Sequence, residues 1–264
     1  MTTSQELHDR IVGQNVPKRF LANVARNGAT TVLQWKNTAG EWDSWTLDQL
    51  AEVTARLTRA LQELGVGRGD KVVLMLRNRA EFHPLDLAVM FRGATPVSIY
   101  NSSAPEQIEY LVNDCGAKVA IVEDSGFVER FLKVRDALPT IEHIAVIEPF
   151  EGIGDDIVRY ADMAAFEPAD LAAEAEAATL DDLATIIYTS GSTGPPKGVM
   201  LTHSNVLWTL ESVGEIMRDQ THIEDFAGKR HVSYLPMAHV MERLLGHYYM
   251  VSGQHAICVA KSTM

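Results

Sequence analysis

Apolar and polar positions alternate in blocks along the chain, and the blocks predict strands separated by single helices. Continuous apolar runs at residues 71–76, 119–123 and 143–148 are typical of buried parallel strands. Residues 95–100 predict another strand of this kind, and residues 30–45 predict a β-hairpin. Because parallel strands need crossover connections, the pattern predicts an α/β fold with mostly parallel, doubly wound sheets and flanking helices.

Capping signals mark where two of the connecting helices begin. Thr46 and Gln49 match a capping box, in which two side chains bond to free backbone N–H groups at the helix start. Ser103 and Glu106 match the same pattern, with a proline in the first turn. The second of these helices is expected to end near Gly116.

The pattern restarts after an Ala- and acid-rich segment, residues 167–182, which we interpret as a solvated helix or linker. A boundary there divides the chain into a first α/β subdomain, residues 1–180, and the start of a second, residues 181–264. The second part has predicted strands at 184–189, 231–235 and 255–259, and helices from about residues 204 and 239. We expect the last apolar strand to be unpaired or uncovered, which would favour self-association.

Composition limits the classes of partner. The 264 residues carry a formal net charge of −12, which argues against broad nucleic-acid binding but not against one local phosphate site. The two cysteines lie in no metal-binding or redox pattern, and the polar N-terminus lacks the apolar core of a signal peptide. Cytoplasmic residence is therefore the expectation.

The most informative segment is YTSGSTGPPKGVMLTH, residues 188–203, in which residues 190–198 are predicted to form a loop. Its glycines allow unusual backbone conformations and close approach of a ligand. Consecutive N–H groups in such a loop form an anion-binding concavity, and Lys197 adds a mobile positive charge suited to a phosphate chain. The segment therefore predicts a phosphate-binding loop.

Two better-known phosphate motifs do not match this segment. The Walker A pattern needs Gly-Lys followed by Ser or Thr, whereas Lys197 follows a proline and precedes a glycine. The Gly-x-Gly-x-x-Gly fingerprint of dinucleotide-binding folds is absent as well. A flexible Gly/Ser linker is the remaining alternative, although linkers do not usually place Pro-Pro-Lys between a buried strand and a helix.

The loop resembles the phosphate-binding signature of the adenylate-forming superfamily, which includes acyl-CoA synthetases, luciferases and peptide-synthetase adenylation domains. YLPMAHVMER, residues 234–243, resembles the next motif in the form found in long-chain acyl-CoA synthetases. Residues 99–123 are similar to the same family, and the resemblance runs from about residue 18 onward. It implies a chain that is truncated within the large N-terminal domain of such an enzyme.

The resemblance implies a function and a set of site residues. The enzyme would be a long-chain fatty acid–CoA ligase, which forms an acyl-adenylate from a fatty acid and ATP and then a thioester with coenzyme A. Lys197 and His239 would be catalytic, and the Thr189 hydroxyl would be a ligand of Mg²⁺. The residues implied to bind the nucleotide phosphates are Thr189, Ser190, Gly191, Ser192, Thr193, Gly194, Lys197 and Gly198.

Several alternatives stay open. His239 could merely cap or pack at a helix start, and Glu242 and Arg243 are expected to form a local structural pair. The family's later motifs, including the mobile C-terminal lysine, would lie beyond residue 264, so we expect this N-terminal part to be inactive alone. It could instead be a non-catalytic nucleotide-binding module, or an adenylating enzyme that loads a carrier-protein thiol. Peripheral membrane contact to collect substrate and a homodimer are further expectations.

Overall fold

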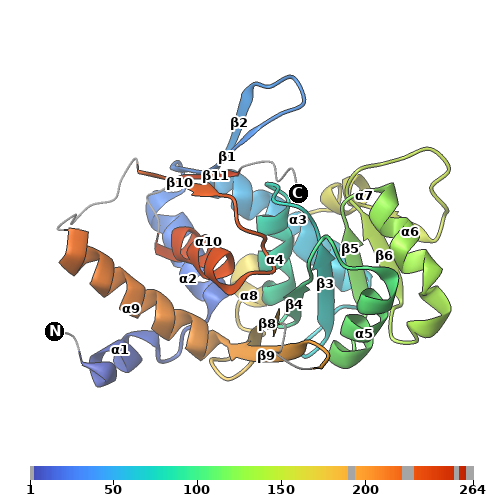
Figure 1. The fold of residues 1–264 in the computed structure, drawn as a ribbon. Coiled ribbons are helices and arrows are strands. Elements are labelled where there is room, and N and C mark those ends of the chain that lie inside the picture. The colour runs from blue at the N-terminus through green and yellow to red at the C-terminus, as the bar shows by residue number, and fades with distance from the viewer. Residues whose placement is uncertain (1–2, 190–193, 222–228, 253–255, 260–264) are drawn as a thin grey trace.

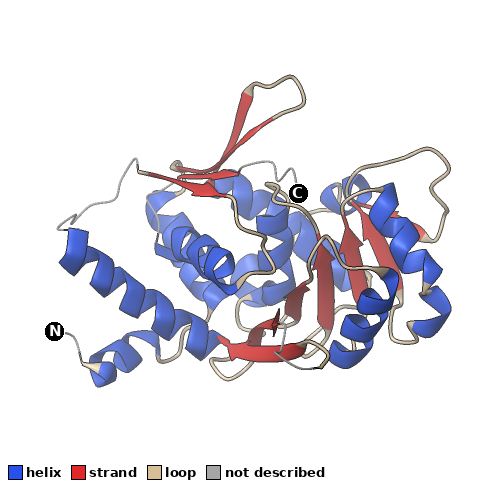
Figure 2. Ribbon diagram, in the orientation of Figure 1, coloured by secondary structure: helices blue, strands red, loops and turns tan. Residues whose placement is uncertain are grey.

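The computed structural model describes residues 3–189, 194–221, 229–252 and 256–259, and it contains two sheets with helices packed around them (Figures 1 and 2). The larger sheet has seven strands in the order β7-β6-β5-β3-β4-β8-β9. All neighbours in it are parallel except β8 and β9, which pair antiparallel. Its strands are β3 (Lys71–Met75), β4 (Thr95–Ser98), β5 (Val119–Val122), β6 (His143–Val146), β7 (Ile157–Arg159), β8 (Leu183–Thr189) and β9 (Lys197–Thr202).

Helices cover both faces of this sheet, as the alternation along β3 shows. Val73 and Met75 pack with α5 and α6, whereas Val72 and Leu74 pack with α3 and α4 on the opposite face. The predicted doubly wound α/β fold is confirmed. The helices are α1 (Ser4–Ile11), α2 (Val16–Asn27), α3 (Leu47–Glu63), α4 (Phe82–Phe91), α5 (Pro105–Cys115), α6 (Ser125–Lys133), α7 (Tyr160–Ala164), α8 (Leu171–Glu174), α9 (His203–Thr221) and α10 (Val240–Ser252).

The second sheet joins distant parts of the chain, in the order β10-β11-β1-β2. Its strands are β1 (Thr31–Lys36), β2 (Trp42–Thr46), β10 (Arg230–Ser233) and β11 (Ala256–Val259). The β1–β2 hairpin is present as predicted and projects from the body of the molecule (Figure 1). Strand β11 is parallel to β10 on one side and to β1 on the other. The expectation that this strand would be unpaired is therefore wrong.

The first capping box is confirmed and the second is shifted by one residue. Thr46 caps α3, and Gln49 accepts from its backbone N–H at 2.9 Å. Helix α5 instead has Ala104 at its N-cap, where the Gln107 side chain accepts from the Ala104 N–H at 3.0 Å. An alanine has no side-chain acceptor, so only half of the box exists.

The Ala- and acid-rich segment packs against the first helices of the chain. The side-chain amide of Asn15 donates to the carbonyls of Ala175 and Ala178, each at 2.8 Å. The boundary between residues 180 and 181 stays a prediction. Strand β8 on its far side pairs with β4, so the larger sheet continues across that position.

Candidate functional site

The phosphate-loop segment, residues 188–203, contains the end of β8, the connection that follows it and all of β9, which pairs antiparallel with β8. Lys197 is the first residue of β9 and lies opposite Thr189, the last residue of β8. The prediction of a loop over residues 190–198 is therefore wrong at its end, because Lys197 and Gly198 belong to a strand. The hairpin brings the predicted phosphate-binding lysine beside the predicted metal-binding threonine.

Gly198 is explained by packing across the hairpin. A Cβ atom at this position would lie 2.9 Å from Ile186 Cγ2 and 3.3 Å from the ring of Tyr188. Gly194 is different, because its φ of +101° lies in the region that favours glycine. Of the two glycines of the segment that the structure describes, Gly194 supports the expected backbone freedom, whereas Gly198 provides room for the Ile186 side chain and the Tyr188 ring.

The side chains at the two ends of the connection are accessible. Both Thr189 and Lys197 are exposed, and no ion pair to Lys197 is found within the described part of the chain. An exposed ammonium group that is not already neutralised is available to an anionic ligand. Four predicted phosphate-binding residues lie outside the described residues: Ser190, Gly191, Ser192 and Thr193.

The donors for a magnesium ion are few. The described residues contain no group of three or more His, Cys, Asp or Glu side chains placed to hold a metal. Mg²⁺ commonly keeps several waters and uses one or two protein ligands together with substrate phosphates. The single Thr189 hydroxyl fits that mode of binding, in which waters and the phosphates of a nucleotide would supply the other ligands.

His239 lies at the start of α10 and caps it. The Met241 N–H donates to His239 Nδ1 at 3.3 Å, and the Arg243 N–H donates to the His239 carbonyl at 3.2 Å. This arrangement requires a lone pair on Nδ1, so the other ring nitrogen of a neutral imidazole would carry the proton. The imidazole is exposed, and among the described residues no hydrogen bond joins it to Thr189 or Lys197. The cap does not occupy Nε2, and the catalytic role of His239 stays a prediction.

Glu242 and Arg243 have structural partners, but they do not pair with each other as expected. The Glu242 carboxylate accepts from the Leu235 N–H at 3.3 Å, which fixes the turn before α10. Asn78 reaches the same turn from the end of β3 and donates to the Leu235 carbonyl at 2.8 Å. Arg243 points instead to Asp86 of α4.

Asp86 is the centre of a buried ionic network between α4 and α10. It accepts a short hydrogen bond from Arg243, and its other oxygen lies 2.8 Å from His247 Nε2. Burial alone would raise the pKa of Asp86, but Arg243 and His247 outweigh it and hold the pKa below its ordinary value. Sequence reasoning missed this network. The sign of it in the sequence is Asp86 itself, an aspartate within the mostly apolar segment FHPLDLAVMF. All ten residues of this helix, α4, are buried in the structure.

His203 is a buried packing residue at the start of α9. The Val16 N–H donates to His203 Nδ1 at 3.3 Å, which requires the neutral imidazole. Burial, assisted by the neighbouring His247, lowers the pKa of His203 to about 4.

We expect His203 to make the protein less stable in acid. Between pH 6.5 and about 4 the unfolded state binds a proton that the folded state excludes, so stability falls as the pH falls through this range. The loss should reach about 3 kcal/mol and stop near pH 4. Urea unfolding at several pH values measures it. The His203→Asn variant keeps an oxygen that can accept from the Val16 N–H, and its free energy of unfolding should fall by about 3 kcal/mol less than that of the wild type over this pH range. The same pH dependence in the variant and the wild type would contradict the assignment.

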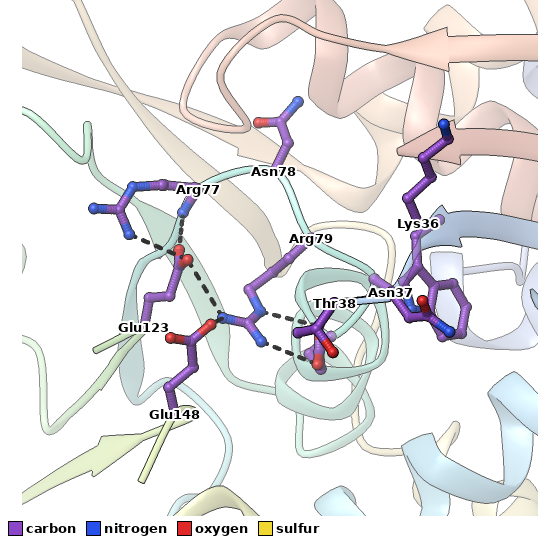
Figure 3. A pocket seen from close by; sticks show the side chains of 11 residues that line it. Lys36, Asn37, Thr38, Arg77, Asn78, Arg79, Glu123 and Glu148 are labelled. Carbon is purple, nitrogen blue, oxygen red and sulfur yellow. Dashed lines mark hydrogen bonds and ion pairs between the residues drawn. The ribbon is translucent and has the colours of Figure 1, made fainter. Parts of the chain in front are cut away.

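A cavity of about 290 Å³ lies at the carboxyl ends of β3, β5 and β6 (Figure 3). From β3 the chain passes to β4 on one side, and it then returns to form β5 on the other side of β3. The carboxyl ends of β3 and β5 are therefore the switch point at which such sheets usually bind ligands. However, Arg79 already lies 3.4 Å from Glu123 and 3.1 Å from Glu148, and Arg77 lies 3.1 Å from Glu123. Because carboxylates neutralise both guanidinium groups, we assign no phosphate site here. The cavity is lined by Trp35, Lys36, Asn37, Thr38, Arg77, Asn78, Arg79, Ala80, Glu81, Glu123 and Glu148.

None of the helices in the described part of the chain combines the length and hydrophobicity needed to cross a bilayer.

Comparison with known proteins places these features in a family. The long-chain-fatty-acid–CoA ligase FadD15 of Mycobacterium bovis is 32% identical over 206 residues, which cover 78% of this chain and 34% of that protein. The long-chain-fatty-acid–CoA ligase ACSBG2 of Rattus norvegicus is 29% identical over 238 residues, covering 87% of this chain and 35% of the relative. The chain thus spans about a third of the length of these relatives.

Solved structures agree on the fold. The anthranilate CoA ligase AuaEII, in complex with anthranoyl-AMP, matches with a TM-score of 0.78 at 23% identity, over 98% of this chain and 47% of that one. The profile of the AMP-binding enzyme family matches residues 20–264, which include the β8–β9 hairpin and the start of α10. The chain belongs to the family of AMP-binding enzymes.

Proposed function

We propose that the chain is the N-terminal part of a long-chain fatty acid–CoA ligase, which activates a fatty acid with ATP and transfers it to coenzyme A. The observation that carries the proposal is the exposed Lys197 beside Thr189 at the open end of the β8–β9 hairpin. The names of the relatives favour a long-chain fatty acid as the substrate.

The chemistry explains why a lysine is needed there. A carboxylate is a poor electrophile, so it is first joined to the α-phosphate of ATP, with release of pyrophosphate. The thiol of coenzyme A then attacks the acyl carbon of the acyl-adenylate and displaces AMP, which leaves the thioester. Lys197 would stabilise charge on the β- and γ-phosphates as pyrophosphate leaves, and His239 would orient the fatty acid carboxylate through Nε2. The Thr189 hydroxyl would hold a Mg²⁺ ion, which would supply positive charge to offset that of the phosphates.

The activity is proposed for the full-length protein, since the chain spans about a third of its relatives. Residues 1–264 alone are expected to make no acyl-CoA, because the resemblance places the adenine, ribose and C-terminal lysine contacts elsewhere in such an enzyme.

The substrate class is tested by pyrophosphate release from the full-length enzyme across acyl chain lengths. Palmitate and oleate should be used with a kcat/KM at least tenfold above that of acetate, benzoate or any amino acid. A preference for acetate or benzoate would overturn the long-chain assignment.

The acceptor is tested separately with acyl-adenylate made beforehand. Coenzyme A should consume it, whereas transfer only to a carrier-protein thiol would support the alternative enzyme. Nucleotide binding without release of pyrophosphate from ATP, whichever carboxylate is supplied, would support a non-catalytic module.

A further inference from the structure

We propose that Tyr110 is a positioning residue that holds Lys197 in place by fixing the peptide that precedes it. The proposal rests on the proposed function, because it assigns Lys197 to the departing pyrophosphate. The Tyr110 hydroxyl donates to the carbonyl of Pro196 at 2.9 Å. That carbonyl belongs to the peptide group that joins Pro196 to Lys197.

This contact comes from a rigid support. Helix α5 buries Ile108, Leu111 and Val112 against the larger sheet, and Gly116, whose φ is +65°, caps its C-terminal end. Tyr110 itself is half-buried and packs against the same core. The hydroxyl group is therefore presented from a fixed helix to a strand end that is exposed.

The strand end needs such a contact because the ladder with β8 stops there. Thr189 and Lys197 form the last pair of the hairpin, and β9 is the edge of the sheet among the described strands. A peptide group is planar, so fixing the Pro196 carbonyl also orients the N–H of Lys197. The backbone of Lys197 is then held by β8 on one side and through its own peptide group by α5.

A second tether from the same face of α5 holds the incoming strand. The Tyr188 hydroxyl lies 2.7 Å from Asp114 Oδ2, and Asp114 is four residues after Tyr110. Residues four apart on a helix lie on one face. Burial, followed by the nearby Asp114 carboxylate, raises the pKa of Tyr188, so this hydroxyl stays a donor. One face of α5 thus contacts both sides of the hairpin connection, through Tyr188 in β8 and through the Pro196 carbonyl just before β9.

The two tethers predict an effect on chemistry rather than on stability. Tyr110 and Pro196 are both partly exposed, so their polar atoms can bond to water once the contact is lost. A small displacement of a charged group, in contrast, costs much of its effect on a reacting phosphate. Removing the hydroxyl should therefore slow adenylation while the protein stays folded.

The test is Tyr110→Phe in the full-length enzyme. The kcat/KM for ATP in pyrophosphate exchange should fall about tenfold, and thioester formation from supplied acyl-adenylate should change less than twofold. The melting temperature should shift by no more than about 2 °C. Tyr160→Phe, which removes a hydroxyl from α7 on the opposite face of the sheet, is the matched control and should leave pyrophosphate exchange unchanged.

A double variant asks whether Tyr110 acts through Lys197. If it does, Tyr110→Phe should lower the kcat/KM for ATP only slightly in an enzyme that already carries Lys197→Ala, because the effects of substitutions at residues that share one role are not additive. Full additivity, or equal losses in both half-reactions, would overturn the proposal.

Binding of inorganic pyrophosphate, measured by calorimetry, separates this proposal from the proposed function. Tyr110→Phe should weaken the affinity severalfold, in the direction of Lys197→Ala. If the wild type binds pyrophosphate but adenylates no carboxylate, the proposed function fails while the binding loss still supports the positioning role. Unchanged affinity in Tyr110→Phe, or a wild type that binds no pyrophosphate, would refute that role.

Discussion

Replacing Lys197 with alanine in the full-length enzyme is expected to slow the adenylation half-reaction on the order of 100-fold or more, because one preorganised contact to a developing oxyanion has this effect. The ammonium group is exposed at the start of β9, where it can follow the charge onto the leaving pyrophosphate. Pyrophosphate exchange measures this step. Thioester formation from supplied acyl-adenylate should be much less affected, since no pyrophosphate leaves in that step.

The matched control is Lys133→Ala, which removes an exposed lysine from the last turn of α6. It should leave both half-reactions unchanged. Equal losses in the two half-reactions of Lys197→Ala would show instead that the lysine supports the structure of the hairpin.

Asp86→Ala is expected to lower the free energy of unfolding by about 3–5 kcal/mol, which is typical when one partner of a buried ion pair is removed. The variant leaves Arg243 and His247 without their carboxylate, and both side chains are almost fully buried. Urea unfolding at pH 7 measures the loss. The surface pair of Arg159 and Asp162 is the comparison, and Asp162→Ala should cost less than about 1 kcal/mol.

Replacing the whole network separates the charge from the packing. A variant with Asp86→Leu, Arg243→Met and His247→Leu buries no unpaired charge, so it should be more stable than Asp86→Ala. If Asp86→Ala costs less than about 1 kcal/mol, the network is not ionised in the folded protein.

The five inner strands of the larger sheet, β3, β4, β5, β6 and β8, could be predicted because a strand that is buried on both faces has a continuous apolar run in its sequence. The short edge strand β7 (Ile157–Arg159) was not predicted. The β8–β9 hairpin was harder, because β9 is an edge strand with exposed apolar residues, Val199 and Met200, and shows no such run. Its first two residues looked like loop for the same reason. A glycine there suggested backbone freedom, whereas it is the Ile186 side chain, together with the Tyr188 ring, that leaves no room for a Cβ.

Of the candidate site, too, some residues were predicted from the sequence and others were missed. Thr189 and Lys197 were both predicted from one short segment, and the hairpin places them together because they are neighbours across its ladder. Tyr110 and Asp86 were missed, since each acts on a residue that is distant in sequence and only the fold brings them near. A pattern read along one chain does not contain such pairings.

The parallel pairing of β1 with β11 affects how the protein folds as it is made. Leu33 aligns with Ile257, so strand β11 leaves the ribosome long after its neighbour. At ordinary rates of synthesis the delay is roughly 10 to 45 seconds. Until then the β1–β2 hairpin has no third strand, and an isolated hairpin is at best marginally stable in water. The larger sheet, whose strands β3 to β9 emerge first, can fold during translation. The smaller sheet must wait, with its nascent hairpin exposed to chaperones or to other chains.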